Sequence, residues 1–150
     1  MDDRPARRDA VAQKQWDKLR TLLAAIFPAN RFYTQKFQAA GAPRAVPSLA
    51  EFSRQIPFTL KTELVADQEA HPPFGTNLTY PLSRYIAFHQ TSGTTGRPLR
   101  CLDTAESWDW WLRCWITVYQ AAGVTAADCV FFPFSFGPFI GFWSAFEAAR

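Results

Sequence analysis

The octet Thr91-Ser92-Gly93-Thr94-Thr95-Gly96-Arg97-Pro98 lies between two stretches that have the composition of β-strands. Residues 84–90, before it, alternate and are rich in aromatic and branched side chains, and residues 99–102, after it, form a second short strand pattern. Two strands joined by a polar loop predict a hairpin-like unit. The loop itself concentrates hydroxyls, glycines and one guanidinium, and this composition indicates the kind of ligand that the loop binds.

The loop carries the side chains that suit a phosphate group. Glycine lets the backbone adopt positive φ, so that main-chain N–H groups can converge on an anion. Hydroxyls add hydrogen bonds to a charged acceptor, and a guanidinium can pair with the same oxygens. The candidate phosphate-binding residues are therefore Thr91, Ser92, Gly93, Thr94, Thr95, Gly96 and Arg97. A plain hairpin turn built from Ser, Thr and Gly is the alternative interpretation.

The spacing of the glycines excludes the two common nucleotide loops. A Walker loop needs four residues between its glycines and then Lys with Ser or Thr, whereas two residues separate Gly93 from Gly96 and no Lys follows. A dinucleotide fingerprint needs three glycines that open a helix, and this chain lacks them as well. Any nucleotide binding here would therefore use a different loop.

Composition and charge place the chain among globular proteins. Of its 150 residues, 48% are hydrophobic and 19% are charged, and a net charge of +3 is too small to indicate nucleic-acid binding. Aromatic residues make up 16% and fall mostly after Tyr80, which predicts a large core or a ring-lined pocket. The three cysteines form no CxxC pair and no secretory signal is visible, so we expect a cytoplasmic protein.

The hydrophobic pattern of the whole chain predicts an α/β fold with a helical start and then a mixed, partly parallel sheet with packed helices. The expected elements are a helix over 9–27, short helices capped by Asn30, Ser48 and Thr59, an aromatic helix from Asp103 to Gly123, a buried strand over 129–132 and a last helix from Phe139. A spanning helix over 129–146 is not expected, because two prolines and two glycines interrupt that uncharged stretch.

The segment HQTSGTTGRP, residues 89–98, resembles the signature loop of the adenylate-forming acyl-CoA synthetase (AMP-binding) superfamily, and within it the phenylacetate-CoA ligase branch. Further segments have the order and spacing of that branch: RFYTQKFQAAG (31–41), SLAEFSRQIPFTLKTEL (48–64), HPPFG (71–75), AAGVTAADCV (121–130) and FSFGPFIG (134–141). The resemblance implies that residues 1–150 are an incomplete N-terminal portion of an AMP-binding domain, with residues 1–29 as an N-terminal helix and tail.

The resemblance also implies an activity. Enzymes of this branch use ATP and Mg²⁺ to convert a carboxylic acid to an acyl-adenylate, and coenzyme A then displaces AMP. In such an enzyme the loop would hold the β- and γ-phosphates through Ser92 to Gly96, with Arg97 where the branch often has lysine. The expected partners are a small aryl or related acid, ATP and CoA, and neither nucleic acid nor membrane.

An acid-binding pocket is implied by position as well. Phe134 and Phe139 would face the ring of the acid, and Gly137 and Gly141 would leave room for it. Plain core packing of these phenylalanines is the alternative. His89, which precedes the loop, receives no catalytic role, and no catalytic residue is expected within the chain.

The branch's adenine-binding, metal-binding, ribose-binding and catalytic lysine motifs do not occur in the chain. We therefore expect these 150 residues to lack the C-terminal remainder of the enzyme and to be inactive by themselves. Two alternatives remain. One is a non-catalytic fragment or binding module. The other is a nucleic-acid-binding GxxG module, which the strand before the loop and the small net charge disfavour.

Overall fold

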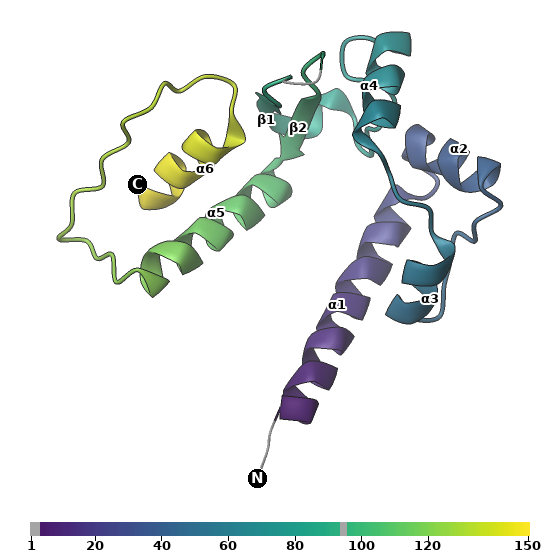
Figure 1. Ribbon diagram of the computed structural model, residues 1–150, viewed down its shortest axis with the longest axis horizontal. Coiled ribbons are helices and arrows are strands. Elements are labelled where there is room, and N and C mark those ends of the chain that lie inside the picture. The colour runs from purple at the N-terminus through teal and green to yellow at the C-terminus, as the bar shows by residue number, and fades with distance from the viewer. Residues whose placement is uncertain (1–3, 94–95) are drawn as a thin grey trace. The chain divides into compact units, whose positions relative to one another are not determined.

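The computed structural model describes residues 4–93 and 96–150, with the side chains of residues 4–6 left out. Within it the chain forms two compact units, Met1–Tyr80 and Pro81–Arg150. The division follows a connection rich in proline and glycine that ends at Pro81. Figure 1 shows the elements of each unit along the chain.

The first unit consists of helices. They are α1 (Arg4–Ile26), α2 (Arg31–Ala39), α3 (Leu49–Gln55) and α4 (Lys61–Ala70). All four were expected from hydrophobic spacing and capping signals. This unit contains none of the candidate site residues.

Asn30 organises the start of α2. Its side chain is almost fully buried, with 2% exposed. Its Oδ1 accepts a hydrogen bond from the Tyr33 amide at 3.1 Å, and its Nδ2 donates to Asn77 Oδ1 at 2.9 Å and Thr79 Oγ1 at 3.1 Å. The predicted N-cap is therefore confirmed, and the same side chain also ties α2 to the end of the unit.

The starts of α3 and α4 were predicted less well. Ser48 Oγ accepts from the Glu51 amide at 3.2 Å, but the Glu51 carboxylate bonds to Arg54 and Gln55, so half of the capping box forms. The prediction of Thr59 as a cap was wrong, because α4 has Leu60 as its N-cap residue. The Glu63 carboxylate accepts from the Leu60 amide at 2.6 Å, which is the half of a capping box that the N3 residue supplies.

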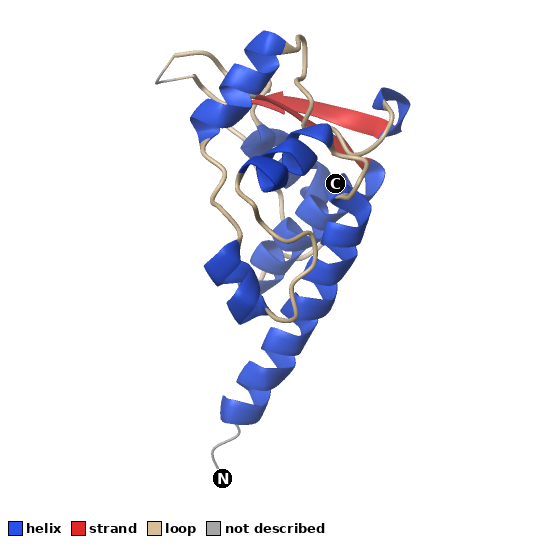
Figure 2. Cartoon of the chain, turned by 90° about the vertical axis from the view of Figure 1, so that its right-hand side faces the viewer, coloured by secondary structure: helices blue, strands red, loops and turns tan. Residues whose placement is uncertain are grey.

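The second unit contains a short antiparallel sheet and a helix pair. Its elements are the 3-10 turn Leu82–Arg84, β1 (Tyr85–Gln90), β2 (Arg100–Thr104), α5 (Ala105–Ala121) and α6 (Ile140–Ala149). Figure 2 shows β1 and β2 as adjacent red arrows. Their register pairs His89 with Cys101 and Gln90 with Arg100, which confirms the predicted hairpin-like unit.

The buried strand predicted over 129–132 is absent from the described residues. Cys129 is exposed, and the exposed fractions of Val130 and Phe131 are 37% and 82%. A strand buried on both faces needs a neighbour to pair its backbone, and the described sheet holds β1 and β2 alone. The prediction of a strand from this apolar run was therefore wrong, because the described part of the unit offers the run no sheet to join. The partly parallel sheet expected from it is likewise absent from the described residues.

The N-cap residue of α5 is Thr104, one residue after Asp103, where the helix was predicted to begin. Thr104 Oγ1 accepts from the Ser107 amide at 3.3 Å, while Asp103 remains in β2. Three aromatic side chains of α5 then donate hydrogen bonds to α6. They run from Trp108 Nε1 to Glu147 Oε2 (2.6 Å), from Trp115 Nε1 to Ser144 Oγ (2.9 Å) and from Tyr119 OH to the Ala145 carbonyl (2.8 Å). The aromatic face of α5 therefore serves as a helix-pairing surface.

The described helices include none with the length and apolar composition that crossing a lipid bilayer requires. Helical start, short sheet and packed helices together make a mixed α/β arrangement, so the predicted fold class is confirmed at this level.

Candidate functional site

Two hydrogen bonds between Thr91 and Leu99 join the two ends of the candidate phosphate loop, and we call this pair of residues the neck of the loop. The Thr91 amide donates to the Leu99 carbonyl at 3.0 Å, and the Leu99 amide donates to Thr91 Oγ1 at 3.0 Å. These contacts extend the β1–β2 ladder by one step, so residues 92–98 leave the sheet from a fixed base. The Thr91 hydroxyl accepts a structural hydrogen bond here, in addition to the ligand role predicted from sequence.

Both loop glycines have positive φ. The values are 68° at Gly93 and 132° at Gly96, and the Gly96 amide donates to the Gly93 carbonyl at 2.9 Å. A Cβ atom at Gly93 would lie 3.0 Å from the Gly96 carbonyl oxygen and 3.1 Å from Pro98 Cδ. The loop therefore requires glycine at position 93 for both conformation and space. At Gly96 only the conformation requires it, because no atom lies within 4 Å of an added Cβ.

The remaining loop residues divide into two groups. Thr94 and Thr95 lie outside the described residues, so their predicted contacts with phosphate are not described. Ser92, Gly96 and Arg97 are exposed at the surface of the second unit, where a ligand has access to them. The loop thus combines a fixed neck with an accessible hydroxyl and guanidinium.

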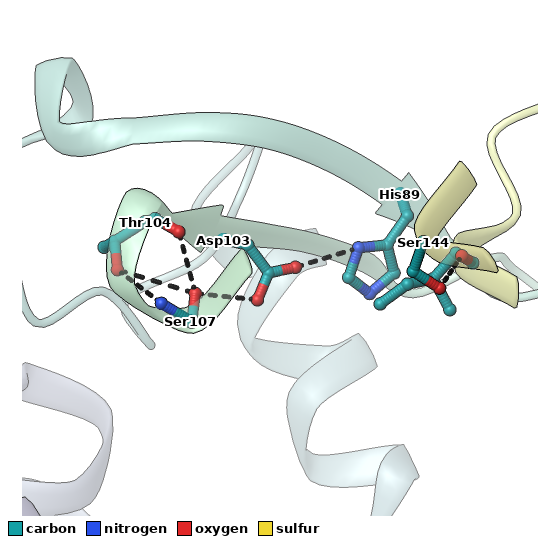
Figure 3. Close-up of polar contacts among 6 residues, drawn as sticks. His89, Asp103, Thr104, Ser107 and Ser144 are labelled. Atoms are coloured by element: carbon teal, nitrogen blue, oxygen red, sulfur yellow. Dashed lines mark hydrogen bonds and ion pairs between the residues drawn. The ribbon is translucent and has the colours of Figure 1, made fainter. Parts of the chain in front are cut away.

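A buried pair beside the loop was missed in the sequence analysis. His89 Nδ1 lies 3.1 Å from Asp103 Oδ2, with 15% and 11% of the two side chains exposed (Figure 3). The Ser107 hydroxyl donates to Asp103 Oδ1 at 2.9 Å. Burial lowers the pKa of His89, and the Asp103 carboxylate opposes that effect more weakly. The strand register could have indicated this contact. His89 pairs with Cys101, and Asp103, two residues after Cys101, lies on the same face of the sheet as His89.

The predicted acid-pocket residues lie on the segment that leads into α6. Phe139 is the N-cap residue of α6 and is 39% exposed, and a Cβ at Gly137 would lie 3.3 Å from its ring. Phe134 stacks on Phe142, with ring centroids 4.5 Å apart. Gly141 has open space around it. The structure therefore brings Gly137 and Phe139 together, while Phe134 packs on α6 and still exposes 59% of its surface.

A main-chain hydrogen bond joins residues 134–141, the candidate acid segment, to the end of β1, just before the loop. The Gln90 amide, at the end of β1, donates to the Pro138 carbonyl at 2.7 Å. Gln90 directly precedes the loop, and Pro138 lies between the two residues just described, Gly137 and Phe139. The two candidate subsites are therefore adjacent along the backbone of one unit.

The described residues contain no group of three His, Cys, Asp or Glu side chains that could hold a metal ion. The three cysteines are free thiols, and burial raises the pKa of Cys101. The site therefore offers main-chain amides, hydroxyls, a guanidinium and an imidazole as its polar groups, which suits the binding of an anion.

Comparisons with known proteins agree with this geometry. The chain is 29% identical over 133 residues to the phenylacetate-coenzyme A ligase of Pseudomonas putida, covering 89% of this chain and 29% of the relative. It is 28% identical over 137 residues to the enzyme of the same name from Aromatoleum evansii, covering 91% and 30%. The chain thus spans about 30% of the length of these curated relatives. No family model matches the sequence.

Solved structures of a 2-hydroxyisobutyryl-CoA ligase are also similar. A form in complex with 2-HIB-AMP and CoA in the thioesterification state has a TM-score of 0.83 and 30% identity, covering 96% of this chain and 30% of that one. An open conformation of the ligase, in complex with the same two ligands, has a TM-score of 0.83 and 27% identity, covering 92% and 32%.

The fold is therefore that of the N-terminal part of the adenylate-forming CoA ligases. Within that class the resemblance of the sequence to phenylacetate-CoA ligases, first seen in the loop and the surrounding segments, is confirmed over about 90% of the chain.

Proposed function

We propose that this chain supplies the phosphate-binding loop and part of the acid pocket of an ATP-dependent acid–thiol ligase. Such an enzyme converts an aryl or related carboxylic acid to an acyl-adenylate and then to an acyl-CoA thioester. The known relatives are CoA ligases that are about three times as long as this chain, so the complete reaction belongs to the longer protein. The three free thiols suit a reducing cytoplasm, which is where we place the enzyme.

The observation that carries the proposal is the conformation of residues 91–93 and 96–99. Positive φ at both glycines leaves main-chain groups without side chains in front of them, and the Thr91–Leu99 hydrogen bonds hold the base of the loop. A hairpin turn that only connects two strands does not require an exposed guanidinium and serine beside such a backbone. The binding of a polyphosphate uses both groups.

In the proposed reaction the loop binds and orients the β- and γ-phosphates of ATP. A carboxylate oxygen of the acid attacks the α-phosphorus, the bond to the β-phosphate oxygen breaks, and pyrophosphate leaves. Ser92, the loop amides and Arg97 offset the charge that develops on this leaving group. The thiol of CoA then attacks the acyl carbon, and AMP leaves with the bonding electrons.

The acid is proposed to lie against the segment 134–141. Phe134 and Phe139 would offer ring faces to an aromatic acid, each contact favouring binding by about 0.5–1.5 kcal/mol. Gly137 and Gly141 would leave room for it. The Mg²⁺ that the resemblance implies is not assigned to any side chain of this chain, because the described residues hold no suitable group.

The 150 residues alone are expected to bind polyphosphate without turnover. Positioning of two reactants and of the metal supplies much of the rate of such a reaction, and the chain spans about 30% of its relatives. Turnover by the isolated chain in ATP–pyrophosphate exchange with phenylacetate would contradict this part of the proposal.

The decisive experiment is a calorimetric titration of the chain with inorganic pyrophosphate. Gly93→Val places a branched side chain where the Gly96 carbonyl and Pro98 leave no room, so we expect binding to weaken about tenfold or more. Gly41→Val is the matched control, because Gly41 has a φ of 60° and no atom within 4 Å of an added Cβ. Equal affinity of the Gly93→Val variant and the wild-type chain would overturn the proposal.

A further inference from the structure

The pair formed by His89 and Asp103 lies next to the candidate loop and has no part in the function proposed above. His89 is two residues before Thr91, which follows the end of β1 and continues its ladder by bonding to Leu99. At the spacing of extended backbone, residues two apart face the same side about 7 Å apart. Asp103 comes from the neighbouring strand and contacts the imidazole from the side (Figure 3). A titratable ring is therefore fixed beside the base of the loop.

The imidazole of His89 is held at its Nδ1 edge by the Asp103 carboxylate. Nδ1 and Asp103 Oδ2 are both buried, and neither has another hydrogen-bond partner among the described residues. Because Nδ1 is buried, the 15% of the side chain that remains exposed belongs to its other atoms. Ser107, which donates to the second carboxylate oxygen, keeps Asp103 in place.

An anion bound in the loop would change the electrostatic environment of the His89 ring. A buried imidazolium beside one carboxylate is only partly compensated, and burial lowers the pKa of His89 more than Asp103 raises it. A bound polyphosphate would bring further negative charge to the same neighbourhood and favour the protonated ring. The doubly protonated ring could donate from Nδ1 to Asp103 and from Nε2 toward the ligand.

We propose that His89 takes up a proton when a polyphosphate binds to residues 91–98, so that an imidazolium held by Asp103 joins the anion site. The inference rests on the proposed function, because it requires an anion in that loop. It makes the affinity for polyphosphate depend on pH through one named side chain.

No other described group competes for this role. On β2, Cys101 is the cross-strand neighbour of His89, and its raised pKa keeps it an uncharged thiol at neutral pH. Arg100 comes directly before Cys101, at the start of β2. On α5, Glu106 contacts Arg84 at 3.0 Å, and Asp109 contacts Arg113 at 2.7 Å. Among these, Asp103 alone acts on the pKa of His89.

The chain has two histidines, which makes a direct test possible. The ring signals of His89 and His71 are followed by NMR from pH 5 to pH 8.5, with and without saturating pyrophosphate, and a His71→Gln sample assigns them. We expect the pKa of His89 to rise by about one unit on binding, which corresponds to about tenfold tighter binding by the protonated form. His71, in the first unit, is the internal control and should not shift.

Calorimetry of two variants separates this inference from the function on which it rests. Protonation of pyrophosphate itself affects all proteins alike, so the ratio of wild-type to variant affinity isolates the histidine. For His89→Gln, which keeps a neutral donor, we expect similar affinity at pH 8 and weaker affinity than wild type at pH 6, with the ratio approaching about tenfold as the pH falls below the ligand-free pKa of His89. Asp103→Asn should reduce the rise in the pKa of His89.

The outcomes are distinct. Binding by the wild-type chain with no shift in the pKa of His89, or with the same pH dependence in His89→Gln, would overturn this inference and leave the loop assignment standing. Absence of pyrophosphate binding by the wild-type chain at every pH would overturn both.

Discussion

At the scale of single residues, His89 also links stability to pH in the ligand-free chain. Burial lowers the pKa of His89 below its ordinary value of 6.5. The unfolded chain therefore binds a proton more readily than the folded chain does. The contribution of His89 to stability is complete above pH 6.5 and is lost as the pH falls through the lower folded-state pKa.

This sign gives a measurable expectation. Urea unfolding, followed by the fluorescence of the second unit's tryptophans, should show lower stability at pH 5.5 than at pH 7.5 for the wild-type chain. His89→Gln should remove part of that difference, because glutamine does not titrate. An equal pH dependence in both proteins would show that the ring is not protected from protonation in the fold.

Local sequence signals predicted some residue roles and failed at others. Asn30 and Ser48 were identified as caps because an N-cap is recognised from a few neighbouring residues. Asp103 was misassigned because Thr104, the next residue, can cap equally well, and the register of β2 decides between them. The contact of Asp103 with His89 depends on strand pairing across the loop, which no local pattern contains.

At the scale of elements, Asn30 stabilises α2 by more than its capping bond. Asn30→Ala removes that bond and also leaves Asn77 and Thr79 without their donor at a buried site. We expect a loss of about 2–3 kcal/mol in the free energy of unfolding of the first unit, measured by urea titration. Ser48→Ala, which removes one capping bond at α3, should cost about 1 kcal/mol. Equal losses would mean that the contacts with Asn77 and Thr79 contribute nothing.

The pairing of α5 with α6 gives a second prediction at this scale. Trp115→Phe removes the donor to Ser144, whose side chain is 1% exposed, so we expect a loss of about 1 kcal/mol or more in the stability of the second unit. Trp111→Phe is the matched control on the same helix, because Trp111 is 42% exposed. The two variants should be distinguishable by urea unfolding with circular dichroism, and identical curves would contradict the role of the hydrogen bond.

Element prediction from sequence succeeded wherever an element is stabilised locally. The helices and the β1–β2 pair followed from spacing, caps and a polar loop between two strand patterns. The strand expected over 129–132 failed because a buried strand depends on neighbours that a sequence pattern cannot supply. The glycine-bearing loop was predictable because its conformation requires particular residue types, whereas the acid segment could be placed only by resemblance.

At the scale of the whole molecule, large apolar side chains remain at the surface of the second unit. Ile86, Phe131 and Trp110 are 64%, 82% and 55% exposed, whereas the buried hydrophobic residues among those described are Phe37, Val46, Trp108 and Ala145. Exposed apolar surface of this kind favours association.

The isolated chain should therefore bind a hydrophobic dye such as ANS and self-associate as its concentration rises. Analytical ultracentrifugation and ANS fluorescence over a concentration series test this expectation. Phe131→Ser should reduce dye binding, because Phe131 is the most exposed of these three residues. A monomer that binds no dye and melts in one sharp transition would contradict it.

The hydrogen bond between the Gln90 amide and the Pro138 carbonyl has a kinetic consequence. Under the proposed function, this bond links the backbone beside the nucleotide loop to the backbone beside the acid, so we expect occupancy of one site to change the rate of dissociation from the other. A ligase assembled around this unit should therefore show synergy between its two substrates, with the acid leaving more slowly when nucleotide is present. Stopped-flow measurements of acid release, with and without a non-hydrolysable ATP analogue, would reveal that dependence.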